Sequence, residues 1–506
     1  MVKRWSGTIR AHPSAGVAFV YAVITLLMTY PLGLRLGTHL FSSTNDFWIY
    51  PWNNWWVREA LLEAYTVYRT PYLFYPVGAE LFSHGFSWFN TSLWLPLQAL
   101  LGTLAAHNIT ILVTYVVAGW TAYLLAHEIT GSRSAAFVAG LIYAFYPHRY
   151  AHRGQLKLLG NQWMPLVGLF LVRTMQPRRL WERLGLAAAL ILCGLSGLHQ
   201  LFLAGVWSAT WLLGQALFGN LRGAWRGAWK LAVGVLVCLI ILGPLLVPIV
   251  RAVAREPDVQ LETDATPDEK RTDLLAFFIP PADHSALRIE PLGQLYEKTI
   301  KFGGPTVTIG WSVLVLAGLG VWRRREAAMP WLLSAVVLAC LSLGSRLQIN
   351  GRLLPVPLPY SLLRPTVIGT FIRHPNRFNI ALGLPICVLS ALGWEALCAA
   401  WGFVRRRGLF ATLFVSTLIA LEYSTIPVST VSAPHSPCYN RLREEQGEFA
   451  VADFPIDMNK DKYAMYVQTL HQRPIVGGHV SRPPTDAHRF VEEVPLLRAA
   501  REELPD

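Results

Sequence analysis

A single carboxylate opens the first long segment between two apolar runs. The stretch Thr44 to Arg58, TNDFWIYPWNNWWVR, contains one acid, Asp46, among aromatic and asparagine side chains. Trp and Tyr favour the depth at which a bilayer meets water, because their rings are apolar and their tips are polar. A carboxylate at that depth can accept a proton or a hydrogen bond from a polar substrate. The alternative is an aromatic belt that anchors the segment in the membrane and carries a solvated Asp.

Basic side chains gather in two later segments, which the topology argued below places on the same side of the membrane. The candidate ligands are Arg149, His152, Gln155 and Lys157 in the first segment and Arg373, His374 and Arg377 in the second. A guanidinium fork matches phosphate geometry, so a phosphate-bearing ligand would account for these charges. Arg149 and His152 are three residues apart and would face one anion if the segment is helical. The alternative is contact with lipid headgroups or snorkelling from helix ends.

Two further outer residues are candidates for contact with a sugar. Glu297, in LYEKTIKFGG, is the acid nearest to the next apolar run and could orient a hydroxyl, or it could pair with Lys298 or Lys301. His84, in ELFSHGF, is either a sugar contact or a solvated or capping histidine. The six cysteines are scattered without a C-x-x-C pair, which predicts neither a metal cluster nor a disulfide framework.

These residues must be positioned by membrane helices. Of the 506 residues, 53% are hydrophobic and 15% are charged, and the apolar positions form runs of roughly 17 to 25 residues. Backbone groups in lipid must be satisfied internally, so many such runs predict an all-α polytopic bundle. The net charge of +13 does not indicate nucleic-acid binding, because Lys and Arg collect in short segments between the runs. The runs contain few ionisable groups, which argues against an ion-coupled transporter or a channel.

Eleven transmembrane helices are predicted, at about 15–34, 107–126, 134–147, 160–175, 184–198, 200–218, 229–250, 305–322, 328–344, 378–401 and 408–427. The positive-inside rule favours an interfacial or re-entrant position for 87–105, because a crossing there would move every Arg-rich short loop to the outside. The N-terminus is then cytoplasmic, and segments 35–106, 148–159, 251–304 and 345–377 lie outside. We expect a membrane domain over 1–427 and an extracytoplasmic tail over 428–506. In that tail GEFAVADFPID is predicted as a strand and DKYAMYVQTL as a helix.

The chain resembles the GT-C class of integral-membrane glycosyltransferases over about residues 10–430. The resemblance rests on a basic N-terminus, one apolar run, an outer loop that opens with Asp46, interfacial aromatic stretches, a run followed by G-S-R, and a short run that ends in P-H-R-Y-A-H-R-G-Q. The nearest relatives in pattern are bacterial lipopolysaccharide and mannosyl transferase-like proteins, which take sugars from polyprenyl-phosphate carriers. It implies a GT-C-like bundle of about 11 transmembrane helices in the plasma (inner) membrane, with interfacial helices in 35–106 and a small α/β C-terminal extension.

In that class the first outer acid is the general base, which the resemblance carries onto Asp46. Basic residues near the outer ends of later helices hold the carrier phosphate, which carries that role onto Arg373 and Arg377 and also onto Arg149 and Lys157. Many members have a second acid beside the first, whereas Asn45 precedes Asp46 here. No cofactor follows with certainty, and a divalent cation stays open.

The implied partners are a polyprenyl-phosphate-sugar donor, a lipid or glycan acceptor and membrane lipids, with no nucleic acid. The expected reaction is transfer of a hexose or pentose to a hydroxyl on the outer face, with inversion at the anomeric carbon. A second hypothesis is a non-catalytic protein on the same scaffold that binds or translocates a lipid-linked saccharide. A third is a structural assembly partner that uses the 428–506 tail.

Overall fold

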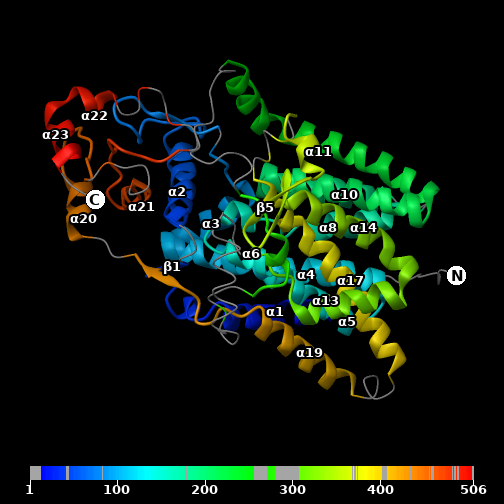
Figure 1. Cartoon of the computed structure of the whole chain (residues 1–506). Helices are drawn as coiled ribbons and strands as arrows, with labels where there is room; N and C mark the ends of the chain where they lie inside the picture. Colours follow the sequence, from blue (N-terminus) through cyan, green and yellow to red (C-terminus); the bar gives the residue numbers. More distant parts are fainter. Residues whose placement is uncertain are drawn as a thin grey trace.

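The computed structural model describes residues 13–41, 45–82, 84–176, 180–255, 270–280, 284, 307–366, 369, 372, 374–401, 407–433, 436–454, 456, 461–480, 483, 486 and 489–503. Two parts stand out in Figure 1: a bundle of long helices, and the C-terminal segments α20 to α23, which lie beside α2 at one end of that bundle.

Each of the eleven ranges predicted to cross the membrane contains a helix. They are α1 (Pro13–Met28), α4 (Thr103–Thr130), α5 (Arg133–Phe145), α8 (Met164–Thr174), α9 (Leu180–Ser196), α10 (Leu198–Phe218), α11 (Leu221–Arg255), α13 (Trp311–Arg323), α14 (Arg325–Ser342), α17 (Phe378–Ala400) and α19 (Gly408–Glu422). Among the described residues, five helices (α4, α10, α11, α14 and α17) are long and apolar enough to cross a bilayer. The number of eleven crossings stays a prediction.

Shorter helices connect or cap this bundle. They are η1 (Leu32–Leu34), η2 (Asn45–Trp48), α2 (Ile49–Leu62), α3 (Trp88–Leu101), α6 (Pro147–Ala151), α7 (Leu156–Leu159), η3 (Leu274–Phe277), α15 (Tyr360–Leu363), η4 (Pro375–Arg377), α20 (Pro437–Glu444), α21 (Asp461–His471), α22 (Arg489–Glu493) and α23 (Pro495–Glu503). The segment 87–105 forms α3 and the first turn of α4, separated by Gly102 at a φ of 81°. This break interrupts the apolar run, so α3 and α4 are separate elements.

The strands form three small antiparallel pairs. They are β1 (His39–Phe41) with β6 (Thr430–Ser432), β2 (Arg69–Thr70) with β3 (Ala79–Glu80), and β4 (Arg346–Ile349) with β5 (Arg352–Pro357). The pair β1–β6 joins segment 35–106 to the tail, with Leu40 opposite Val431.

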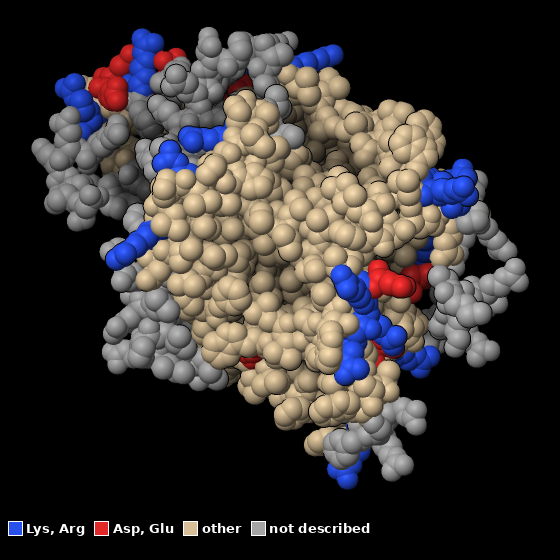
Figure 2. Space-filling model, turned by 45° about the vertical axis from the view of Figure 1, so that its right-hand side comes forward, with Lys and Arg blue, Asp and Glu red and all other residues tan. Residues whose placement is uncertain are grey.

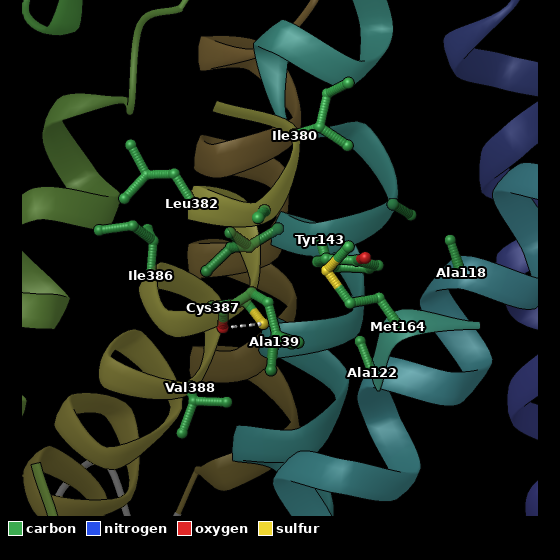
Figure 3. Close-up of a cluster of buried hydrophobic side chains, with 14 of the residues drawn as sticks. Ala118, Ala122, Ala139, Tyr143, Met164, Ile380, Leu382, Ile386, Cys387 and Val388 are labelled. Atoms are coloured by element: carbon green, nitrogen blue, oxygen red, sulfur yellow. Dashed lines mark hydrogen bonds between the residues drawn. The ribbon is translucent and has the colours of Figure 1, made fainter. Parts of the chain in front are cut away.

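The bundle core is built around α17, most of which is buried inside the protein. Figure 3 shows Cys387 of α17 beside Ala139 and Tyr143 of α5, with Ala118 and Ala122 of α4 beyond them, whereas Ile386 points to the opposite side of α17. Gly393 of α17 lies directly against α13, and a Cβ there would overlap the Leu316 carbonyl. Small residues at such contacts let membrane helices approach closely.

The outside of the bundle is apolar. Figure 2 shows a broad face without charged side chains, with Lys, Arg, Asp and Glu confined to its margins. Large exposed apolar side chains line α11 and α19, for example Leu236, Ile240, Leu409, Phe410 and Phe414. A surface of this extent suits contact with lipid and not with water.

The tail is closely joined to segment 35–106. Its predicted helix is present as α21, which packs against α2 and η2. The predicted strand in GEFAVADFPID is present, within the described residues, as a single bridge between Val451 and Ile475. Within the described residues the tail consists mainly of the helices α20 to α23, and its strand β6 pairs with β1 outside the tail.

Candidate active site

Asp46 lies in η2 and binds two donors from distant segments. The Lys462 Nζ donates to Asp46 Oδ1 at 2.8 Å, and the Gln155 Nε2 donates to Asp46 Oδ2 at 3.2 Å. The Asp46 side chain remains 39% exposed, whereas that of Lys462 is 8% exposed. The carboxylate is thus held from one side and open on another.

The aromatic side chains around Asp46 are buried in the protein. Trp52 and Trp56 are each 0% exposed. Trp48 packs on Tyr463 and Tyr466 of α21, with ring centroids 4.9 and 5.1 Å apart. This contradicts the alternative of an aromatic anchoring belt, because these rings dock η2 and α2 onto the tail helix.

The electrostatic surroundings of Asp46 favour the carboxylate form. Burial by itself raises the pKa of Asp46. The hydrogen bond and charge of Lys462 outweigh that effect, and the charges of Lys157 and His479 add to it, so the pKa of Asp46 falls below its ordinary value. Asp46 is therefore ionised at neutral pH.

Lys157 stands on α7, which is fixed to the bundle by Gln200. The Gln200 Nε2 donates to the Lys157 and Leu158 carbonyls at 2.9 and 3.1 Å. Burial and the charge of Arg377 lower the pKa of Lys157 to about 8, while the charge of Asp46 opposes the shift. A lysine with this pKa loses part of its charge close to neutral pH.

Arg377 lies in η4, and its Nη1 is 3.0 Å from His199 Nε2 at the start of α10. The charges of Asp46 and Arg377 both affect the pKa values of two other groups. One is Lys157, and the other is Tyr50, whose pKa is raised by burial and by Asp46 and opposed by Arg377. The Asp46 carboxylate and the Lys157 and Arg377 cations thus lie close enough for their charges to influence one another or the same neighbouring side chain.

Two of the three candidate histidines, His84 and His152, are buried and neutral. His84 Nε2 lies 2.6 Å from Asn53 Oδ1, and burial lowers the pKa of His84 to about 3, with Lys157 and His479 contributing. His152 Nδ1 lies 2.8 Å from the His148 carbonyl. Burial, together with the charges of Arg377 and Lys270, lowers the pKa of His152 to about 4. Both rings lie near the cations without carrying charge themselves.

Arg149 does not face the site. Its guanidinium, 1% exposed, donates to Asn161 Oδ1, to Thr114 Oγ1, and to the carbonyls of Thr114, Ala144 and Leu159. It also lies over the Tyr115 ring. This geometry contradicts the expectation that Arg149 and His152 contact one anion, because the Arg149 donors are used inside the bundle. Spacing along the chain gave no sign of this burial.

Some expected residues cannot be placed. Arg373 and Glu297 lie outside the described residues. His374 is described and immediately precedes η4. Among the residues that the structure describes, no three His, Cys, Asp or Glu side chains lie together as a metal site would require. Asn45 stands beside Asp46 where many GT-C enzymes have a second acid. Among the described residues, no group of acids, histidines or cysteines takes the place of that second acid.

Residues 91–421 match a sequence family described as a domain of unknown function, DUF6311. The chain belongs to the DUF6311 family. No curated protein matches the sequence.

Solved structures resemble this DUF6311 protein in fold. The Archaeoglobus fulgidus oligosaccharyltransferase matches with a TM-score of 0.54 and 13% identity, over 93% of this chain and 65% of its own. The arabinofuranosyltransferase AftD from Mycobacteria matches with a TM-score of 0.54 and 16% identity, over 96% and 33%. ArnT from Cupriavidus metallidurans matches with a TM-score of 0.50 and 13% identity, over 96% and 88%. The DUF6311 protein therefore has a GT-C-like fold, as its sequence predicted, and spans about 65% of the oligosaccharyltransferase.

Sequence reasoning missed two members of the site in this DUF6311 protein. Lys462 and His479 both belong to the tail, and both lower the pKa of Asp46. The predicted helix DKYAMYVQTL contains Lys462, but nothing local indicates which of its faces meets Asp46.

Proposed function

We propose that this protein transfers a sugar from a polyprenyl-phosphate-linked donor to an acceptor hydroxyl on the outer face of the membrane. The main support is the convergence of Asp46, Lys157 and Arg377 in one electrostatic environment on a GT-C-like scaffold. These residues come from three separate segments, and a carboxylate beside two cations is the combination that phosphate release and proton removal require.

Arg377 and Lys157 are the proposed ligands of the carrier phosphate. Two structures with the same fold support this class of ligand: ArnT was solved with undecaprenyl phosphate, and the archaeal oligosaccharyltransferase AglB with dolichol-phosphate. In this protein the phosphate would take up its negative charge beside the Arg377 guanidinium as the glycosidic bond breaks. The apolar outer surface of the bundle would accommodate the carrier's hydrocarbon chain.

Asp46 is the proposed general base. The acceptor oxygen attacks the anomeric carbon while the bond from that carbon to the phosphate oxygen breaks, and the electron pair leaves with the phosphate. The acceptor proton passes to the ionised Asp46 carboxylate, and the single displacement inverts the anomeric configuration. The exposed part of the carboxylate provides the approach for the hydroxyl.

Substitution of Asp46 tests this role. Membranes carrying the protein would be incubated with radiolabelled undecaprenyl-phosphate-linked mannose, glucose or arabinose and a lipid-extract acceptor. We expect Asp46→Asn to lower transfer by about 100-fold or more, the usual contribution of a general base. Glu80→Gln, a change in the same outer loop at an exposed acid that pairs with Arg69, is the matched control and should keep full activity. Unchanged transfer by Asp46→Asn would remove Asp46 from the base role.

A non-catalytic role in binding or moving a lipid-linked saccharide is the second candidate. The ion pair with Lys462 favours it, because a carboxylate with a lowered pKa is a weaker proton acceptor. Saturable binding of undecaprenyl phosphate by the wild type, reduced in Arg377→Ala but not in Arg325→Ala, together with no transfer from any donor, would select this candidate.

A further inference from the structure

The tail helix α21 delivers an ammonium group to the candidate base. Lys462 and Asp46 are 416 positions apart, yet the Lys462 Nζ donates to Asp46 Oδ1 at 2.8 Å. We propose that Lys462 is a positioning residue that keeps Asp46 ionised and oriented toward the acceptor, so that the tail is part of the catalytic unit. This inference rests on the proposed transferase function.

Both oxygens of Asp46 are held, and the side chain remains 39% exposed. Lys462 occupies one acceptor site on Oδ1, and Gln155 occupies one on Oδ2 at 3.2 Å. A carboxylate has about four lone-pair sites, so an acceptor hydroxyl can still bind on the exposed side. The two donors come from different segments, and they fix the plane of the carboxylate before the substrate arrives.

Lys462 is held in place by the packing of α21. The Trp52 Nε1 donates to Gln468 Oε1 at 2.7 Å, and Gln468 Nε2 donates to the Tyr72 and Arg473 carbonyls at 2.7 and 2.8 Å. At the start of α21, buried Asp461 accepts the Gly478 N–H at 2.9 Å. These buried contacts keep the Lys462 ammonium beside Asp46, because reorientation of α21 would break them.

Charged and titratable groups on several neighbouring elements interact electrostatically with Asp46. They are Lys462 on α21, His479 after α21, Lys157 on α7, Tyr50 on α2 and His84 before α3. Burial raises the pKa of Asp46. Without Lys462, only the charges of Lys157 and His479 would oppose that rise. The pKa of Asp46 should then rise, and the carboxylate should take up a proton at higher pH.

The test is the pH profile of transfer by three variants in the assay with radiolabelled undecaprenyl-phosphate-linked sugars. We expect Lys462→Met to lower turnover at neutral pH about tenfold or more, as a misplaced reacting group does. The acid limb of its pH profile should shift to a pH about 1 to 3 units higher, because Asp46 loses one close opposite charge. Lys462→Arg should recover most of the turnover and restore the acid limb.

Two control variants separate this role from simple support of the fold. Tyr439→Phe removes a hydrogen bond to Asp453 within the tail but keeps both the Lys462 charge and the Gln468 contacts that dock α21, so any loss of activity should come without a shift of the acid limb. Arg489→Met removes an exposed positive charge elsewhere in the tail and should resemble the wild type.

The outcomes are distinct. Wild-type turnover and acid limb in Lys462→Met would overturn the inference. So would a loss that Lys462→Arg does not recover, a loss with an unmoved acid limb, or an increase in turnover, which would make the pair inhibitory. Failure of the proposed function would appear differently, as the absence of transfer by the wild type with every donor.

Discussion

The lowered pKa of Lys157 makes phosphate binding sensitive to pH in a defined direction. Burial and the charge of Arg377 disfavour the Lys157 cation, so Lys157 is protonated below about pH 8 and neutral above it. If the protonated form binds phosphate, affinity is present below pH 8 and is lost as the pH rises through that value. The protonated fraction falls from roughly nine tenths at pH 7 to roughly one tenth at pH 9, which predicts about tenfold weaker binding.

The charge of the ligand adds a second limb. Undecaprenyl phosphate is a phosphomonoester whose second ionisation has a pKa of about 6. Its binding should therefore be strongest between about pH 6 and 8. A polyprenyl-phosphate-linked sugar is a diester without that ionisation, so its binding should show only the upper limb.

Equilibrium binding of radiolabelled undecaprenyl phosphate to the purified protein in detergent micelles, from pH 5 to 10, would measure both limbs. Lys157→Arg should keep tight binding at pH 9, and Lys157→Met should bind weakly with no upper limb. Lys230→Met is the matched control, because it changes a lysine on α11 that donates to the Thr174 carbonyl, and it should keep the wild-type profile. Flat wild-type binding between pH 7 and 9, or an upper limb that persists in Lys157→Met, would refute the reasoning.

Two further predictions concern residues that support the site. Arg149→Met leaves several buried carbonyls without their donor, at about 1–3 kcal/mol for each unsatisfied group, so it should lower the thermal unfolding temperature. The protein that does fold should bind undecaprenyl phosphate with unchanged affinity, and a large loss of that affinity would return Arg149 to the site. Gly393→Ala should destabilise the bundle by about 1–3 kcal/mol or more because its Cβ overlaps the Leu316 carbonyl of α13. Gly318→Ala, on α13 where the added Cβ meets nothing, should be neutral or stabilising, and equal unfolding temperatures for the two would contradict the close packing described.

Local patterns were sufficient for the helices and for the fold. Each predicted range contains a helix because a long apolar run must satisfy its backbone internally wherever it lies in lipid. The GT-C resemblance rested on the order of runs and outer loops, and the similarity to solved structures agrees with it. Helix ends were less accurate. The predicted span 15–34 extends beyond α1, which ends at Met28, because the boundary depends on turn geometry and not on hydropathy.

The site depended on contacts between segments. Sequence singled out Asp46 as an isolated acid but could not assign the Trp52 and Trp56 rings to the protein interior. A buried and a lipid-facing aromatic are equally apolar, so composition cannot separate them. Arg149 shows the same limit, since an arginine in an outer segment gives no sign of whether its donors meet a ligand or the carbonyls of its own bundle.

The sequence by itself determined where apolar helices form, which short segments carry the basic residues, and that one acid lies near the start of segment 35–106. Only the tertiary structure decided which cation meets that acid. Lys462 lies 416 positions from Asp46, and their pairing follows from the docking of α21 on α2. Charge interactions depend on separation in space and on burial, and neither quantity is encoded within a single stretch of the chain.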